Sequence, residues 1–140
     1  MELLTKFRFE VDWGGTKIGF SEVSGLNVET ELIEYRDGKT PGDAKLKQAG
    51  LKKYGNVTLK RGMFRSDNEF FAWWKETFED KYKREVTIKL LNESGDPVVS
   101  WSLQEAWPVK VDSTDLKADG NEIAIESIEL AHEGLKLEVY

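Results

Sequence analysis

The chain contains no cysteine, which excludes disulfide bonds, thiolate metal sites, iron–sulfur clusters and thiol nucleophiles. Its only histidine is His132, so a metal site built from several imidazoles is excluded as well. No apolar run approaches the roughly 20 residues that a membrane-spanning helix needs. Met1–Leu4 lacks the basic start and apolar stretch of a signal peptide. These absences predict a soluble domain that is made without a standard export signal.

Charged residues are abundant and make up 33% of the 140 residues. Twenty Lys and Arg against 26 Asp and Glu give a formal net charge of −6, which argues against a general nucleic-acid binder held by phosphate contacts. The length is that of a single domain with one sizeable core, so we expect one domain over residues 1–140.

Apolar residues recur mainly with a period of two, which is typical of half-buried β-strands. Phe7–Trp13 is the first such segment, and Gly14-Gly15 predicts a tight hairpin turn with a return along Thr16–Phe20. Further strands are predicted at residues 26–35, 54–61, 85–91, 98–105 and 122–133.

Two of these segments are irregular. Glu105 interrupts the apolar alternation and Pro108 removes a backbone donor, which predicts a bulge or a sheet edge there. In the last strand Ile123 and Ile125 lie on the opposite parity from Ile128. A second bulge, or burial on both faces, would explain that switch.

One helix is predicted at about residues 67–80. Ser66 and Glu69 match a capping box, and Phe70, Trp74 and Phe78 at i, i+4 and i+8 predict an aromatic face packed on a sheet. The sequence therefore predicts a mainly β fold, a barrel or sandwich of two packed sheets, with one α-helix.

The long polar stretch at about residues 36–53 is unusual inside a compact domain, and it indicates a binding arm or a mobile loop. Lys45, Lys47, Lys52 and Lys53 form a basic patch in it. Solvation, pairing with an acidic neighbouring subunit, and phosphate binding all remain open for this patch.

Residues that could carry catalysis are few. His132 follows an apolar run without a partner motif, which favours a structural or surface role. The acidic turn around Asp112, Asp115 and Asp119 fails the spacing of a calcium loop. We therefore predict that the chain is not an enzyme and has no catalytic residue, cofactor or metal site.

Several strings resemble, in the same order, the tail-tube proteins of contractile phages and related injection systems. They lie at residues 19–26, 33–38, 54–62, 106–110, 113–126 and 128–135, and so cover nearly the whole chain. The string STDLKADGNEIAIE at 113–126 is especially similar to inner-tube proteins of extracellular phage-tail-like particles. Gln48-Ala49-Gly50 departs from the family, whose members often carry Pro-Gly there.

The resemblance implies a structural subunit of the tail-tube fold. Six copies would close a ring through strand pairing, and stacked rings would form a tube that a contracting sheath drives through a target envelope. The implied partners are further copies of the chain, the sheath protein, baseplate and tube-cap proteins, and protein effector cargo, with no membrane binding in isolation. The implied location is a particle assembled in the bacterial cytoplasm and released from the cell. A true phage tube conducting DNA, or a small-ligand-binding β-barrel module, are the alternatives.

The residues that we expect to mediate assembly fall into two sets. The arm set, expected to reach a neighbouring subunit or ring, is Arg36, Asp37, Lys45, Lys47, Lys52 and Lys53. The lumen set, chosen because polar residues lie opposite apolar neighbours, is Asn56, Thr58, Lys60, Ser100, Ser102, Gln104, Glu122 and Glu126. Acidic walls would repel DNA and suit a basic protein cargo.

Overall fold

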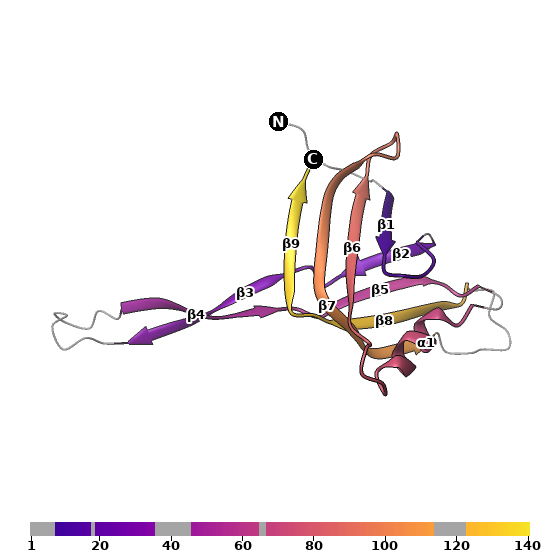
Figure 1. Cartoon of the computed structure of the whole chain (residues 1–140). Helices are drawn as coiled ribbons and strands as arrows, with labels where there is room; N and C mark the ends of the chain where they lie inside the picture. The colour runs from indigo at the N-terminus through magenta and orange to yellow at the C-terminus, as the bar shows by residue number, and fades with distance from the viewer. Residues whose placement is uncertain (1–7, 18, 36–45, 65–66, 114–122) are drawn as a thin grey trace.

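The computed structural model describes residues 8–17, 19–35, 46–64, 67–113 and 123–140 (Figure 1). Within these ranges the chain forms strands and one helix. In chain order they are β1 (Arg8–Asp12), β2 (Phe20–Ser24), β3 (Val28–Tyr35), β4 (Leu46–Tyr54), β5 (Val57–Gly62), α1 (Glu69–Glu76), β6 (Arg84–Leu91), β7 (Pro97–Ser113), β8 (Ile125–Ala131) and β9 (Gly134–Val139). The predicted mainly β class is confirmed. No helix in the described ranges is long and apolar enough to cross a membrane.

The 17-residue strand β7 belongs to two sheets. Its first half pairs with β6 and β9, and β1 completes this upper sheet (Figure 1). Its second half pairs with β8, followed by β5 and β2, and these four strands form the lower sheet. Between the halves, Glu105 has φ 52°, and the register with β8 shifts between Pro108 and Lys110. The predicted irregularity at this point is therefore confirmed.

The core lies where the two sheets and α1 meet. Aliphatic side chains from both sheets surround two tryptophans and a phenylalanine there. The buried set is Val11, Trp13, Val57, Leu59, Phe70, Trp73, Val86, Ile88, Leu103, Ala106, Ile128 and Leu130. Burial of this apolar surface is the main force that holds the sheets together.

The predicted hairpin between residues 7–13 and 16–20 is wrong. Gly14 does have a positive φ of 90°, but β1 pairs with β6 and β2 pairs with β5. The turn instead carries the chain from the upper sheet to the lower one. Buried Trp13 holds it by donating from Nε1 to the Thr16 carbonyl at 2.8 Å.

The helix is shorter than predicted and is not capped as predicted. It begins at Glu69 and ends at Glu76, and its N-cap residue Asn68 makes no side-chain capping bond. The Glu69 carboxylate instead accepts hydrogen bonds from the Thr16 backbone N–H at 2.8 Å and hydroxyl at 3.0 Å. Ser66 lies outside the described residues.

The aromatic face of the helix also differs from the prediction. Phe70 and Trp73, spaced i and i+3, are buried, whereas Phe78 is 77% exposed. Because α1 has about two turns, i+8 falls beyond its end, and Trp74 at i+4 is only partly buried.

Candidate functional site

The most exposed described part of the chain is the hairpin of β3 and β4, which we call the arm. It projects from the lower sheet (Figure 1), and every residue of β3 is exposed. Several exposed residues are large and apolar, including Leu32 and Leu51. Because a two-stranded ribbon without a covered face is marginal in water, an arm of this composition needs a partner surface.

The arm occupies much of the stretch that the sequence predicted as an arm or loop. The structure adds that residues 46–54 of it are a strand, paired with β3. Residues 36–45, which include the predicted contact residues Arg36, Asp37 and Lys45, lie outside the described residues.

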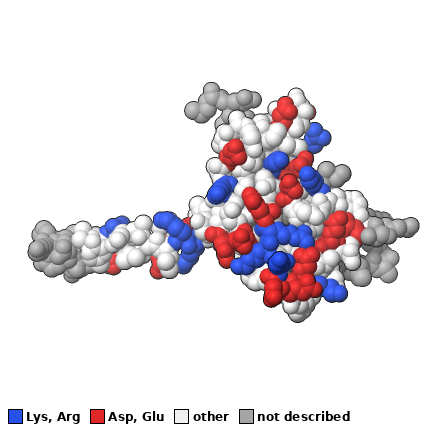
Figure 2. Space-filling view, viewed as in Figure 1, with Lys and Arg blue, Asp and Glu red and all other residues white. Residues whose placement is uncertain are grey.

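The described arm lysines face residues of the arm itself. Lys53 lies opposite Glu29 and Lys47 lies opposite Glu34 in the ladder, while Lys52 Nζ donates to Thr30 Oγ1 at 3.2 Å. Opposite charges at directly facing positions of a ladder attract each other. The charges of the two described strands of the arm are therefore balanced internally, and most of their visible surface is uncharged (Figure 2), which leaves the apolar side chains as their most distinctive binding feature.

The base of the arm is a junction where both strands of the ladder are interrupted, and two glycines lie there. Gly25 has φ 89°, and a Cβ there would collide with the carbonyl oxygen of Asn56. A Cβ at Gly55 would collide with the Asn27 side chain. Here β2 runs into β3 and β4 runs into β5, so the arm and half of the lower sheet form one long ribbon.

His132 contacts both sides of this junction. Its Nε2 lies 2.9 Å from the Gly55 carbonyl oxygen, and its Nδ1 lies 3.0 Å from that of Gly134. Its ring also packs on Tyr54, with centroids 5.6 Å apart. These contacts give the only histidine of the chain a structural role where the arm leaves the sheet.

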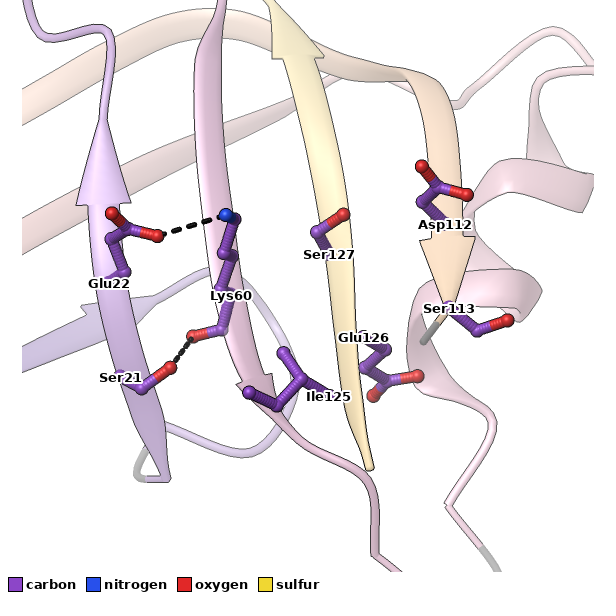
Figure 3. A pocket seen from close by; sticks show the side chains of 8 residues that line it. All are labelled: Ser21, Glu22, Lys60, Asp112, Ser113, Ile125, Glu126 and Ser127. Carbon is purple, nitrogen blue, oxygen red and sulfur yellow. Dashed lines mark hydrogen bonds and ion pairs between the residues drawn. The ribbon is translucent and has the colours of Figure 1, made fainter. Parts of the chain in front are cut away.

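The outward side of the lower sheet, which we call the polar face, carries rows of hydrophilic side chains (Figure 3). One row runs across the strands through Glu22, Lys60, Ser127 and Asp112. Lys60 Nζ lies 3.1 Å from Glu22 Oε2. These residues line a shallow open hollow, which is not the enclosed apolar pocket that a small ligand requires.

A second row on the polar face comprises Ser24, Thr58, Glu129 and Lys110. Asn56 Nδ2 donates to Glu129 Oε2 at 3.1 Å, and Lys110 Nζ lies 3.5 Å from Asp112 Oδ2 of the first row. The two rows together contain two lysines and three carboxylates, so the polar face carries only a small net negative charge. These residues are Lys60, Lys110, Glu22, Asp112 and Glu129.

The structure separates the residues of the expected lumen set. Asn56, Thr58 and Lys60 lie together along the polar face, whereas Glu126 is buried on the opposite side of the same sheet. Three others, Ser100, Ser102 and Gln104, belong to the upper sheet, where Ser102 lies opposite Thr87. Glu122 lies outside the described residues. The same face also carries residues that the expected set did not include, because the parity of one strand cannot show which sheet it joins; they are Glu22, Ser24, Lys110, Asp112, Ser127 and Glu129.

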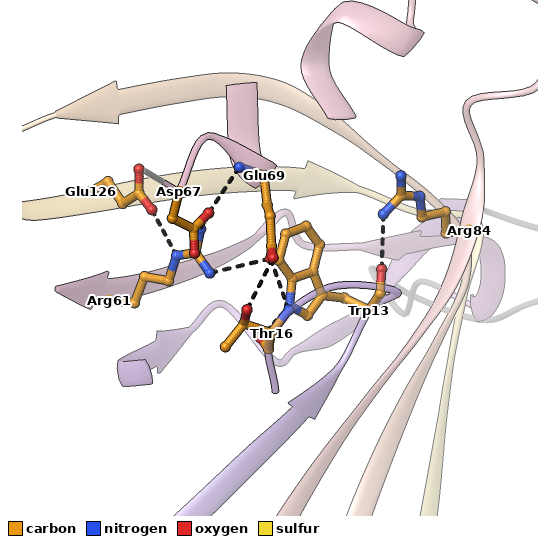
Figure 4. Close-up of polar contacts among 7 residues, drawn as sticks. All are labelled: Trp13, Thr16, Arg61, Asp67, Glu69, Arg84 and Glu126. Carbon is orange, nitrogen blue, oxygen red and sulfur yellow. Dashed lines mark hydrogen bonds and ion pairs between the residues drawn. The ribbon is translucent and has the colours of Figure 1, made fainter. Parts of the chain in front are cut away.

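Behind the polar face, Arg61 is fully buried among three carboxylates (Figure 4). Its Nε donates to Glu126 Oε1 at 2.7 Å and its Nη2 donates to Asp67 Oδ1 at 3.0 Å, while Nη1 lies 3.6 Å from Glu69 Oε2. The guanidinium also lies 4.1 Å from the ring centroid of Phe70. This Arg61 cluster fastens α1 to the lower sheet.

Metal binding and catalysis have little support in the described residues. None of them form a group of three potential ligands that could hold a metal ion. Lys83 has a perturbed pKa, which the hydrogen bond and charge of Glu133 raise above the ordinary lysine value. Because this amine is exposed and its charged form is favoured, it is poorly suited to act as a base.

Comparisons with known proteins agree on one family. The model of the T4-like virus tail tube protein gp19 matches residues 5–136. The chain is similar to one in the sheath–tube complex of the PVC extracellular contractile injection system in its extended state (30% identity, TM-score 0.86, covering 99% of this chain and 93% of that one). It is also similar to a chain of the anti-feeding prophage cap that terminates the tube (29% identity, TM-score 0.85, covering 100% and 93%).

More distant structures share only the fold. Hcp1 from Flavobacterium johnsoniae aligns with a TM-score of 0.59 at 14% identity, over 96% of this chain and 97% of that one. No curated protein matches the sequence.

Proposed function

The chain belongs to the T4-like virus tail tube family and is a tube subunit of an extracellular contractile injection system, and from this premise we propose how its surfaces build the tube. Six copies close a ring through their lower sheets, the rings stack through their arms, and the polar faces line the lumen.

Ring closure follows from the edges of the lower sheet. Within the described residues, β2 pairs only with β5, and the second half of β7 pairs only with β8. Each copy thus presents one unpaired edge on either side of a four-stranded sheet, with backbone N–H and C=O groups that need partners. Pairing β2 of one copy with β7 of the next satisfies both edges and closes a barrel.

The polar face is the side of this barrel that best suits a lumen. The opposite side of the lower sheet bears the core and α1, so it belongs to the wall. We therefore propose a revised lumen set that keeps Asn56, Thr58 and Lys60 and omits Glu126 and the upper-sheet residues. Because its lysines are already paired with carboxylates, the lumen holds passing cargo weakly.

The upper sheet and α1 then face away from the lumen. The relatives come from a sheath–tube complex and a tube-terminating cap, and another comes from a baseplate, so we propose the same partners for this chain. We further propose assembly in the bacterial cytoplasm, release within a particle, and protein effectors as cargo. A DNA-conducting phage tube and a ligand-binding module are not favoured.

The similarity to the PVC tube subunit over 99% of the chain is the observation that carries this proposal. Purified protein is expected to form hexamers that show a central hole in negative-stain images and stack at higher concentration. Multi-angle light scattering gives the mass of the smallest assembly. A monomer at every concentration, or a ring of another order, would contradict the proposed closure.

A further inference from the structure

The upper sheet exposes apolar side chains on its edge strand β9. Leu137 and Val139, which we call the β9 patch, are 61% and 71% exposed. They lie on the same face of the sheet as the core, because Leu137 lies opposite Trp101 in the ladder and Trp101 lies opposite the buried Ile88. The core-forming face of the upper sheet therefore continues past the buried core to the edge of the sheet.

The far ends of the upper-sheet strands reach past the edge of the lower sheet that ends in β2. In Figure 1 the strands of the upper sheet run across those of the lower sheet, and β6, β7 and β9 extend beyond β2. At about 3.3 Å per residue, the six residues of β9 span about 20 Å, whereas the three strand spacings from β7 to β2 cover about 14 Å. The exposed fraction accordingly rises along β9, from the partly buried Leu135 to Val139.

The next copy of the ring lies on this side of the molecule. In the proposed closure, on which this inference rests, β2 of one copy pairs with β7 of the next. The end of β9 that passes β2 therefore lies over the β7 side of the neighbouring copy. Among the described elements, α1 packs mainly on β7, so the neighbour's α1 is the element that the β9 patch meets.

The helix exposes an apolar surface that can receive this patch. Phe71, Trp74 and Phe78, spaced i, i+3 and i+7, form a second stripe beside the buried pair Phe70 and Trp73. Their rings are in contact, with centroids 5.7 Å and 5.3 Å apart, and Phe71 and Phe78 are 53% and 77% exposed. We propose that the β9 patch of each copy packs on this aromatic stripe of the next copy in the same ring.

The contact has the symmetry that a ring requires. It joins two different surfaces, so each copy places its β9 patch on one neighbour and receives the patch of the other neighbour on α1. Such a head-to-tail contact closes when the rotation between copies does. Neither surface belongs to the polar face, so their burial stabilises the ring and leaves the lumen unchanged.

Charged substitutions in the β9 patch test its role in ring closure. The variant Leu137→Asp with Val139→Asp is expected to raise the protein concentration at which half of the chains are in rings by about a hundredfold or more, because two apolar side chains can no longer be buried. The matched control, Lys136→Asp, changes the net charge by the same amount on the opposite face of β9, so rings are expected to persist. Sedimentation velocity over a dilution series measures assembly, and near-UV circular dichroism checks that each variant is folded.

Engineered cysteines locate the contact independently, because the natural chain has none. The variant Val139→Cys with Phe78→Cys, assembled and mildly oxidised, is expected to give linked species on a denaturing gel that stop at six chains, since a contact within one ring closes on itself. Leu137→Cys with Phe78→Cys covers a shift along β9. The control Lys136→Cys with Phe78→Cys places one thiol on the opposite face of β9 and is expected to give no linked species.

Three results would overturn the contact while leaving the ring itself in place. They are linked species of more than six chains, which would place the contact between rings, rings that give no linked species with either β9 position, and rings that form normally in the doubly charged variant. Wild-type protein that forms no ring at all would instead overturn the proposed function, and this contact with it.

Discussion

Replacing Arg61 with alanine is expected to lower the free energy of unfolding by about 3–5 kcal/mol, a large fraction of the roughly 5–15 kcal/mol by which domains are typically stable. Arg61 is fully buried, and its guanidinium is the cation that faces Asp67, Glu69 and Glu126. Its loss leaves three carboxylates close together with poor hydration. Urea unfolding followed by tryptophan fluorescence measures the change, because Trp13 lies within the same cluster.

The matched control for this prediction is Lys60→Ala, at the neighbouring position on the opposite face of β5. Lys60 pairs with Glu22 in a partly exposed setting, so its loss is expected to cost less than about 1 kcal/mol. All variants should be compared at one protein concentration, since assembly stabilises the folded state. Equal destabilisation by the two changes would show that the buried cluster does not hold α1 on the sheet.

Truncation of the arm is expected to abolish stacking while rings still form. Replacing residues 31–51 with Asn-Gly joins Thr30 to Lys52, which already face each other, through a two-residue hairpin turn. The domain should fold because the arm contributes no residue to the buried core. Sedimentation and negative-stain images are expected to show single rings in place of tubes, and full-length tubes would contradict the role of the arm.

A charge swap tests whether ring stacking needs particular charged residues of the arm, or only the presence of the arm. Exchanging the facing residues as Glu34→Lys with Lys47→Glu leaves the net charge of the arm unchanged and preserves the opposite charges across the ladder. Tubes are expected to persist in this variant. If tubes were lost, individual arm lysines would have to contact carboxylates of another subunit, as the sequence first suggested.

Local features of the fold could be predicted from the sequence, whereas strand partners could not. The strands at residues 85–91 and 98–105 were predicted, and they pair as β6 and β7 around a turn in which Asn92 Oδ1 accepts from the backbone N–H of both Ser94 and Asp96. The partner strand of β1 was not predicted, because a Gly14-Gly15 turn is as compatible with a hairpin as with a connection from one sheet to the other. β9 was missed altogether, although Leu135, Leu137 and Val139 alternate with charged residues.

The expected lumen set shows why polarity alone misassigns the faces of a strand. In β8 the charged residue Glu126 faces the core and the apolar residue Ile125 faces outward. The reason is Arg61, which lies opposite Glu126 in the ladder and compensates its charge inside the protein. The sequence gives no sign of this pairing, since 65 positions separate the two residues. The family resemblance, by contrast, covered nearly the whole chain and is confirmed.

A side-chain-resolution cryo-EM reconstruction of the assembled tube tests the central claim most directly. The account predicts six copies per ring, β2 paired with β7 of the neighbouring copy, and Lys60 and Lys110 facing the lumen with Arg61 buried in the wall. A lumen lined instead by the upper sheet, with Ser102 and Lys136 facing the channel, would contradict it.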